Sequence, residues 1–436
     1  MKELEADVVV AGGGIAGLGL ACALAAWDVS VLVLEKRSRA GGIHRGDSLL
    51  PRTTALFARW GVLDAVRAAD AQPISRIEVH HGARKVCETP LAGASRENPY
   101  LVLPHARIEQ VLLERALAFG RARLVRPARV TDLVREGGRV RGVRFETPEG
   151  PAVARARLVV ACDGHRSIVR SRLGIEATPF FYDHAYLGLE ADRPASYENA
   201  MRVHFHPAGG VLLMPRPTRV GIGMLVPVHD RDRWARLSDT QLRAEVVARA
   251  PILRDVAIHR EGANVYELVR AHAARYVKEG AAIVGDAAHA TNPTAGQGMT
   301  MALGDAGLLS DLAGPALESG AERDLDEALS AYEHERWPVN EATVRGSHLL
   351  ARVYALRGAS WNRLKLAGAR LLASPLGRLV VTPILESFIQ DRSPKRPRPE
   401  FANSGVGVSR ALPWAGGTPT PPPGSEFDEG YEEVAA

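Results

Sequence analysis

The chain has 436 residues, 46% of them hydrophobic, and its 55 Lys and Arg against 50 Asp and Glu leave a net charge of only +5. This composition supports a sizeable core in two or three lobes, and so small a charge surplus gives no reason to expect a nucleic-acid partner. The three cysteines have no CxxC spacing or nearby histidine cluster, so we expect no disulfide framework, no metal site and a reducing, cytoplasmic location. Neither a secretory signal nor an apolar run of the roughly 18 residues that a spanning helix requires is apparent.

The first predicted elements are a strand, a helix and a second, parallel strand. A β-branched apolar run covers Ala6 to Ala11, an Ala- and Leu-rich stretch reaches Ala26, and a second apolar run covers Val29 to Leu34. This order predicts a βαβ unit.

A glycine-rich turn, GGGIAG, follows the first of these strands. Gly12 permits the tight turn, Gly14 lets the backbone approach a pyrophosphate, and Gly17 lets helix and strand pack closely. Glu35 ends the second strand, where a carboxylate accepts hydrogen bonds from an adenosine ribose. Together they predict a dinucleotide site, without distinguishing NAD from FAD. The expected lining is Gly12, Gly14, Ile15, Ala16, Gly17, Glu35 and Lys36.

The next stretch is predicted to leave the parallel sheet and return to it. Apolar spacing predicts one or two helices between Asp47 and Asp70 and another over Ile108 to Phe119. A small β-meander is expected between about Leu124 and Val160, ending in a buried strand over Ala156 to Ala161.

From about Pro179 to Val277 the chain is expected to form a sheet-based substrate domain. Its predicted strands are Ala200 to His206, Gly210 to Pro215 and Val220 to Val226. A helix is predicted over Asp239 to Arg249. Another strand follows at Ala281 to Gly285, and helical patterning runs from Met299 to about Gln390. Beyond Ser393, a composition of Pro, Gly, Ser and charge predicts a disordered tail.

A second motif specifies the dinucleotide. The segment from Val284 to Ala306, VGDAAHATNPTAGQGMTMALGDA, resembles the second FAD motif of flavoprotein monooxygenases of the para-hydroxybenzoate hydroxylase superfamily. The resemblance implies that Asp286 binds the ribityl chain and that the following loop lies beside the flavin ring and pyrophosphate. Thr300 stands where many relatives have Asn. The implied cofactor residues here are Asp286, Pro293, Gly296, Gln297, Gly298 and Met299.

Two further segments resemble the same superfamily. CDGHRSIVRSRLGI, from Cys162 to Ile175, resembles its Asp-Gly motif, which implies contacts of Asp163 and Gly164 with FAD and the nicotinamide; Arg166, Ser167 and Arg170 also match. Arg45 in HRGDSLLP resembles the Arg that reaches the flavin diphosphate. Either His105 or Arg107 is expected against the cofactor. The segment YEHERWP, from Tyr332 to Pro338, matches a recurrent helix ending of the family.

The fold class expected from this resemblance is α/β. A Rossmann-like FAD-binding domain of the para-hydroxybenzoate hydroxylase type would carry an inserted mixed β-sheet substrate domain and C-terminal helices. The FAD-binding domain would comprise residues 1–178 and 278–345, the substrate domain 179–277, the C-terminal helices 346–392 and the disordered tail 393–436.

The resemblance implies a monooxygenase in which NADH or NADPH reduces FAD and O2 forms a flavin C4a-hydroperoxide that hydroxylates an aromatic or polyketide-like small molecule. The protein would supply a dry pocket and place the substrate. No nucleophilic side chain is required, and none is predicted. Catalytic residues stay unassigned, with His204, His206, Tyr182 and Tyr186 as candidates for contact with a substrate hydroxyl and Met214 and Met224 as possible pocket lining.

Several alternatives remain open. RGDSLLP and TAGQGMTMAL also resemble segments of squalene-epoxidase-like proteins, which would imply epoxidation of a lipophilic alkene. A prenyl-chain reductase shares the fold, and FAD could serve a non-catalytic flavoprotein. A halogenase is disfavoured because its Trp-x-Trp-x-Ile-Pro signature is absent.

The stretch from Arg345 to Arg378 is basic, has no acidic residue and carries many apolar side chains. Such a stretch could lie on a membrane or cover a lipophilic substrate. The sequence favours a solvated helix pair that packs on the cofactor domain.

Overall fold

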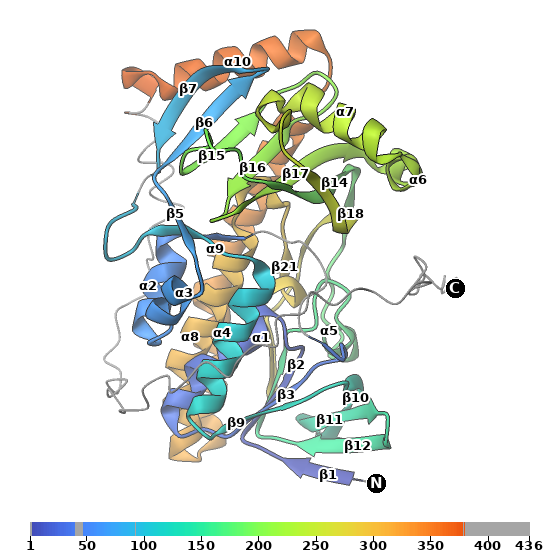
Figure 1. The fold of residues 1–436 in the computed structure, drawn as a ribbon. Helices are drawn as coiled ribbons and strands as arrows, with labels where there is room; N and C mark the ends of the chain where they lie inside the picture. Colours follow the sequence, from blue (N-terminus) through green and yellow to red (C-terminus); the bar gives the residue numbers. More distant parts are fainter. Residues whose placement is uncertain (1, 40–46, 92, 378, 380–436) are drawn as a thin grey trace. The chain divides into compact units, whose positions relative to one another are not determined.

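The computed structural model describes residues 2–39, 47–91, 93–377 and 379 (Figure 1). Arg45 and the predicted tail, residues 393–436, lie outside the described residues.

A six-stranded, mostly parallel sheet forms the centre of the cofactor-binding part, with strand order β19-β20-β13-β2-β3-β9. Every residue of its four inner strands is buried, as continuous apolar runs require in a sheet that is covered on both faces. Helices α1 (Ile15–Leu24) and α8 (Gly298–Ser319) pack against each other. The strands are β2 Val8–Ala11, β3 Val31–Leu34, β9 Ala122–Val125, β13 Leu158–Ala161, β19 Val277–Lys278 and β20 Ala281–Ile283.

The predicted meander is a separate four-stranded sheet, β1-β12-β11-β10. It also contains a strand that the sequence did not predict, β1 (Lys2–Glu5), which pairs parallel with β12. β9, at the start of the predicted meander, pairs instead with β3 of the six-stranded sheet. The other meander strands are β10 Arg129–Glu136, β11 Arg139–Thr147 and β12 Gly150–Arg155.

An eight-stranded sheet, in the order β21-β18-β14-β17-β16-β15-β6-β7, forms the sheet-based part of the chain. Two of its strands, β6 (Arg76–His81) and β7 (Arg84–Pro90), come from before residue 179, so sheet membership does not follow the predicted boundary at 178/179. The others are β14 Phe180–Asp192, β15 Ala200–His204, β16 Val211–Pro215, β17 Arg219–Pro227, β18 Ile258–His272 and β21 His289–Ala290.

The two faces of this sheet pack against different partners. One face carries Leu187, Leu213 and Met224, which form a core with Trp234 of α6 (Arg231–Arg236) and Val246 of α7 (Asp239–Arg249). Because side chains alternate along a strand, their neighbours Tyr186, Met214 and Leu225 lie on the other face. We call this second face, which also carries Met201 and Leu212, the inner face.

Helix α4 packs on α1, and α5 packs on β10. The other elements of this part of the chain are α2, α3 and a small sheet, β4-β8-β5. The bounds of all these elements are β4 Ser48–Leu49, β5 Gln72–Ile74, β8 Tyr100–Val102, α2 Pro51–Arg59, α3 Leu63–Ala68, α4 His105–Ala118 and α5 Ile168–Arg172.

The helical prediction after Met299 is confirmed as far as residue 373 by α8, α9 (Glu322–Ala355) and α10 (Ala359–Ala373). Residues 332–338 do not end a helix, because Pro338 lies inside α9, which also runs through the predicted boundary at 345/346. α10 packs on β7 of the eight-stranded sheet and not on the cofactor sheet. None of the described helices is both long and apolar enough to span a membrane.

Candidate functional site

The turn after β2 has the geometry that close approach of a phosphate requires. Gly12 has a φ of +104°, and a Cβ there would lie 2.3 Å from the carbonyl oxygen of Cys162. A Cβ at Gly17 would lie 2.0 Å from the carbonyl oxygen of Gly12, so neither position admits a side chain. The space above Gly14 is open, since the nearest atom to a Cβ would be a Glu109 carboxylate oxygen at 3.9 Å. The turn is therefore closed towards the protein and open towards a ligand at the start of α1.

Glu35 lies beside this turn. Its Oε2 accepts the Gly13 N–H at 2.6 Å, and its Oε1 accepts the N–H and Nε–H of Arg37 at 2.8 and 2.9 Å. Arg37 also reaches buried Glu109 at 3.2 Å, and His105 lies 3.5 Å from the same carboxylate. Burial would raise the pKa of Glu109, but the hydrogen bonds and charges of His105 and Arg37 outweigh it and hold the pKa below its usual value. The expected adenosine end is thus lined by alternating acidic and basic side chains.

Arg37 and Glu109 were not predicted from the sequence. They stand two residues after Glu35 and four after His105, spacings that bring side chains together on a strand end and on a helix. His105 lies within this cluster, whereas Arg107 donates to Gln110 at 2.7 Å along α4. Lys36 is exposed.

The Asp-Gly segment lies at the carboxyl end of β13. Asp163 Oδ2 accepts the N–H groups of Ile168 and Val169 at 2.8 and 3.3 Å, while its Oδ1 is buried without a partner among the described residues. Burial raises the pKa of Asp163, against the hydrogen bond from Ser167 and the backbone. A buried carboxylate oxygen that lacks a donor is suited to a ligand hydroxyl or amide.

Arg170 joins this segment to the second FAD motif. Its guanidinium donates to the carbonyl oxygens of His165 and Ala287, both at 2.9 Å. The turn Gly285–Ala287, which contains Asp286, therefore lies beside the Asp-Gly segment although more than a hundred residues separate them.

A buried polar network behind the Asp286 turn was also not predicted. Asp305 of α8 accepts from Gly285 N at 3.2 Å, from Arg336 Nε at 2.6 Å and from Asn340 Nδ2 at 2.9 Å, and its carboxylate lies 2.5 Å from His289 Nε2. Burial would raise the pKa of Asp305, but the charges of His289 and Arg336 hold it well below its usual value. Asp305 thus fixes the turn to α8 and α9 at once.

The loop after β21 leads into α8. It forms a short helical turn, Pro293–Ala295, then Gly296 with a φ of +63°, and α8 begins at Gly298. No atom lies within 4 Å of a Cβ at Gly296, so the backbone is open there. The first N–H groups of α8 give this end positive potential. The hydroxyl oxygen of Thr300 lies 3.1 Å from that of Thr53 on α2.

The inner face of the eight-stranded sheet meets this loop through Tyr186. Its hydroxyl lies 3.4 Å from Thr294 Oγ1, and burial raises its pKa to about 12. Tyr182 packs nearby but pairs with His348 Nδ1 at 2.9 Å. The structure therefore brings two of the four candidate residues to the predicted flavin loop: Tyr186 approaches Thr294, and Tyr182 interacts with Asn292.

The two histidine candidates lie elsewhere. His204 pairs across the sheet with Val211, whose side chain is in the core under α7, so His204 lies opposite the inner face. It stacks on His80 at 4.9 Å, and burial lowers its pKa to about 3. His206 follows β15, and burial together with the charge of Arg249 on α7 lowers its pKa.

A buried ion cluster on the inner face was missed as well. Arg216 pairs with Asp47 and Glu190, and the exposed fraction of its side chain is only 9%. Asp47 belongs to the RGD segment. The ion pair of Asp47 with Arg216 therefore holds this part of the chain against the end of β16. The residues are far apart in sequence and carry no local pattern that predicts the contact.

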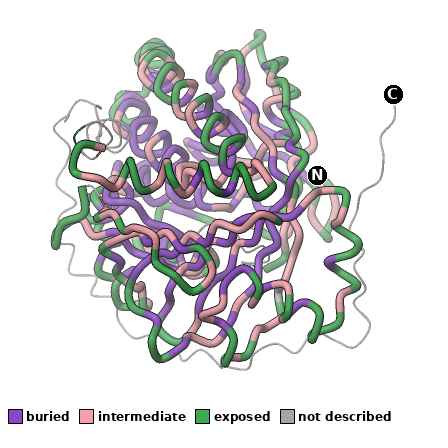
Figure 2. Tube along the Cα trace, turned by 90° about the horizontal axis from the view of Figure 1, so that it is seen from above, coloured by how far each residue is buried: buried purple, intermediate pink, exposed green. Residues whose placement is uncertain are grey.

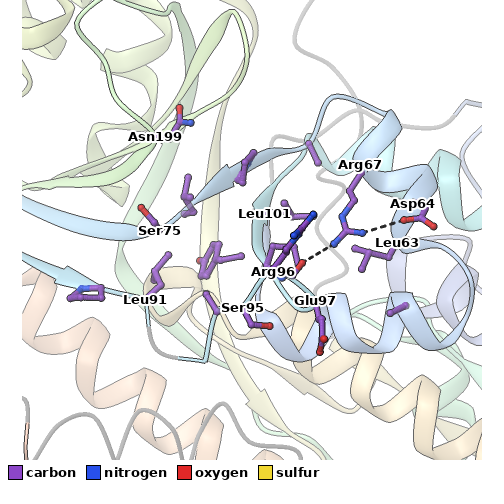
Figure 3. A pocket seen from close by; sticks show the side chains of 18 of the residues that line it. Leu63, Asp64, Arg67, Ser75, Leu91, Ser95, Arg96, Glu97, Leu101 and Asn199 are labelled. Atoms are coloured by element: carbon purple, nitrogen blue, oxygen red, sulfur yellow. Dashed lines mark hydrogen bonds and ion pairs between the residues drawn. The ribbon is translucent and has the colours of Figure 1, made fainter.

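A hollow of about 1530 Å³ lies apart from these motifs (Figure 3). It opens between α3 and the segment around Ser95, where Arg67 bonds Asp64 and the carbonyl oxygen of Arg96. Among the predicted cofactor residues that the structure describes, none lines it, so we do not assign it to the cofactor.

Comparison with known proteins identifies the family and the fold. Residues 5–347 match a family model described as FAD binding domain. Ubiquinone hydroxylase UbiL of Rhodospirillum rubrum is 32% identical over 371 residues, covering 80% of this chain and 82% of the relative. The 6-methylpretetramide 4-monooxygenase of Streptomyces rimosus is 29% identical over 366 residues, covering 81% and 85%. The crystal structure of p-nitrophenol 4-monooxygenase PnpA from Pseudomonas putida DLL-E4 superposes with a TM-score of 0.77 at 21% identity, over 90% of this chain and 100% of that one, which establishes the shared fold.

Proposed function

Since this chain belongs to the class A flavoprotein monooxygenases and is an FAD-dependent oxidoreductase, we propose that it hydroxylates an aromatic or polyketide-like small molecule. In this proposal, NADH or NADPH supplies the electrons, and bound FAD supplies the oxygen-transfer chemistry as its C4a-hydroperoxide. A reducing, cytoplasmic location is part of the same proposal.

Residues of the three motifs would hold the cofactor. The open backbone at Gly14 suits the pyrophosphate and Glu35 the adenosine ribose, while Asp286 and the loop at Gly296 suit the flavin end. The start of α8 would stabilise negative charge on the flavin ring.

The observation that carries the proposal is the 3.4 Å approach of the Tyr186 hydroxyl to Thr294 Oγ1. It places an apolar sheet surface, with Met214 and Leu225, on the same side as the loop that would border the flavin. Such a surface excludes water and accepts a flat apolar ring. With a pKa near 12, Tyr186 stays protonated at neutral pH, so it would orient a substrate oxygen by hydrogen bonding and would not act as a base.

The relatives favour an aromatic or polyketide-like substrate over an isolated alkene, because their names specify hydroxylation of ubiquinone and of a pretetramide. The test is aerobic turnover of the purified yellow protein with NADH or NADPH against panels of phenols, aromatic polyketides and polyenes, followed by mass spectrometry. A substrate-dependent gain of one oxygen with the ring still aromatic is the expected result. Formation of an epoxide or diol from a polyene would show that the enzyme is an epoxidase and not a hydroxylase. Purification of the protein without bound flavin would contradict the whole proposal.

A variant pair tests the site. Tyr186→Phe should keep FAD bound and lower kcat/KM for the substrate about tenfold, as expected for one lost hydrogen bond. His204→Leu, on the opposite face, is the matched control and should leave turnover unchanged. If the two substitutions lowered kcat/KM equally, the inner face would not form the substrate site.

A further inference from the structure

Helix α10 is docked with its polar side inward. Asn362 and Lys365 are buried, and the Lys365 ammonium donates to the carbonyl oxygens of Tyr354 and Leu356 at 3.2 and 2.8 Å, at the end of α9. The Cys87 thiol of β7 lies 3.5 Å from the carbonyl oxygen of Ala369. These contacts fix which side of the helix faces the protein.

The outward side is apolar. Trp361, Leu364, Leu371 and Leu372 have exposed fractions of 47%, 60%, 64% and 51%. We call these residues the apolar face of α10. Leu364 and Leu371 are seven residues apart, close to two helical turns, so the face is one continuous stripe. α10 is uppermost in Figure 1, and in Figure 2, seen from above, exposed positions alternate along it with partly buried ones.

This orientation is the reverse of an ordinary surface helix, which buries its apolar stripe and exposes its polar one. A contiguous apolar surface on a folded protein marks contact with an apolar partner. Hydrophobic side chains that are merely scattered over a surface would not share one stripe.

Charge identifies the partner. Exposed Arg363 and Arg370, also seven residues apart, run along one edge of the apolar face, and residues 342–377 contain no Asp or Glu. Within the described part of the chain, neither of these two arginines forms an ion pair. An apolar stripe edged by arginines is suited to a lipid bilayer with anionic headgroups, in which the helix lies parallel to the surface.

We propose that the apolar face of α10 binds the surface of a membrane that contains anionic lipid. A second copy of the chain is a poorer occupant, because a two-fold contact through this face would bring its arginines close to their own copies. On the buried side of α10, Lys365 donates to the carbonyl oxygen of Tyr354, which packs in the same cluster as Tyr186. The proposal goes beyond the reaction and does not depend on it.

Flotation of the full-length, FAD-loaded protein tests the proposal. Vesicles of phosphatidylcholine with an equal part of phosphatidylglycerol should carry the protein upward, pure phosphatidylcholine should carry much less, and added salt should release it. Failure to float with the anionic vesicles would overturn the proposal.

Substitutions identify the face. The double variant Leu364→Ser and Leu371→Ser should abolish flotation, and Arg363→Gln with Arg370→Gln should weaken it roughly fivefold per residue on anionic vesicles only. Because these side chains are exposed, the flavin absorbance and melting temperature should not change. Leu117→Ser, at a leucine 44% exposed on α4, is the matched control and should float like the parent.

Two outcomes would contradict membrane binding by the apolar face of α10. If ultracentrifugation shows a dimer that the leucine changes dissociate, the face is a contact between copies. Undiminished flotation of the leucine variant would place lipid binding elsewhere on the chain.

Discussion

Glu35 illustrates how one side chain is prepared for a ligand. Its two oxygens already accept a backbone N–H from the glycine turn and two N–H groups from Arg37. Such bonds hold the carboxylate in one orientation, so an incoming ribose would meet a fixed acceptor.

We predict that Glu35→Gln weakens FAD binding by about tenfold to a hundredfold, because a charge-assisted hydrogen bond contributes about 1.5–3 kcal/mol. Titration of the apoprotein with FAD, followed by quenching of flavin fluorescence, measures the change. Glu149→Gln, at an exposed loop position, is the control. If Glu35→Gln bound FAD with unchanged affinity, the Glu35 carboxylate would not contact the cofactor.

His204 makes stability depend on pH. Its pKa falls from 6.5 in the unfolded chain to about 3 in the fold because burial disfavours its charged form. Below pH 6.5 the His204 imidazole is therefore protonated in the unfolded chain but stays neutral in the native state. Stability should fall as the pH decreases from about 6.5 towards 3, with a slope that approaches about 1.4 kcal/mol per pH unit from this residue.

We expect His204→Leu to reduce that slope, measured by urea unfolding at several pH values between about 7 and 4. Exposed His229→Gln should leave the slope as it is. A parallel pair of curves for the parent and His204→Leu would show that His204 does not cause the acid sensitivity.

At the scale of elements, α8 and α9 position the turn Gly285–Ala287, the proposed flavin contact, through Asp305. Replacing this carboxylate leaves Arg336 buried without its counter-charge and frees the Gly285 N–H. Asp305→Asn should destabilise the fold by about 3–5 kcal/mol, as expected for a broken buried ion pair.

Urea denaturation measures this loss. The control, Glu327→Gln, breaks an exposed pair with Arg323 on α9 and should cost under about 1 kcal/mol. A loss in Asp305→Asn no larger than that of the control would mean that the network does not hold the turn.

Elements with local signals were well predicted. α7 spans Asp239–Arg249, as the sequence indicates, because Ser238 and Gln241 form a capping box at its start. The resemblance placed a helix ending at residues 332–338, but α9 continues through Pro338 to Ala355. The membership of β6 and β7 in the eight-stranded sheet depends on pairing with β15, far along the chain, and no local pattern reveals it.

At the scale of the whole molecule, the proposed cofactor contacts come from the glycine turn, the Asp-Gly segment and the loop before α8. A ligand that bridges them binds only the native state, so it should stabilise the whole fold. Removing FAD should lower the melting temperature, and FAD at a hundred times its Kd should restore about 2.7 kcal/mol.

Thermal unfolding of the apoprotein across an FAD series measures this coupling. Glu35→Gln should need more FAD for the same gain, whereas AMP alone should give a smaller one because it cannot reach the loop at Gly296. If the melting temperature did not change with the FAD concentration, the three segments would not form one FAD site.

The sequence by itself determined the βαβ unit, because glycine positions, hydrophobic period and strand-end acids are local requirements of the backbone. The resemblance of its further motifs to a known family gave FAD and the class of enzyme. Only the tertiary structure decided that Tyr186 faces the loop while His204 faces α7, that Arg170 joins two motifs, and that α10 exposes its apolar side. The alternation of side chains on a strand and the docking of a helix depend on register and on distant partners such as Lys365 and Tyr354, and short-range patterns contain neither.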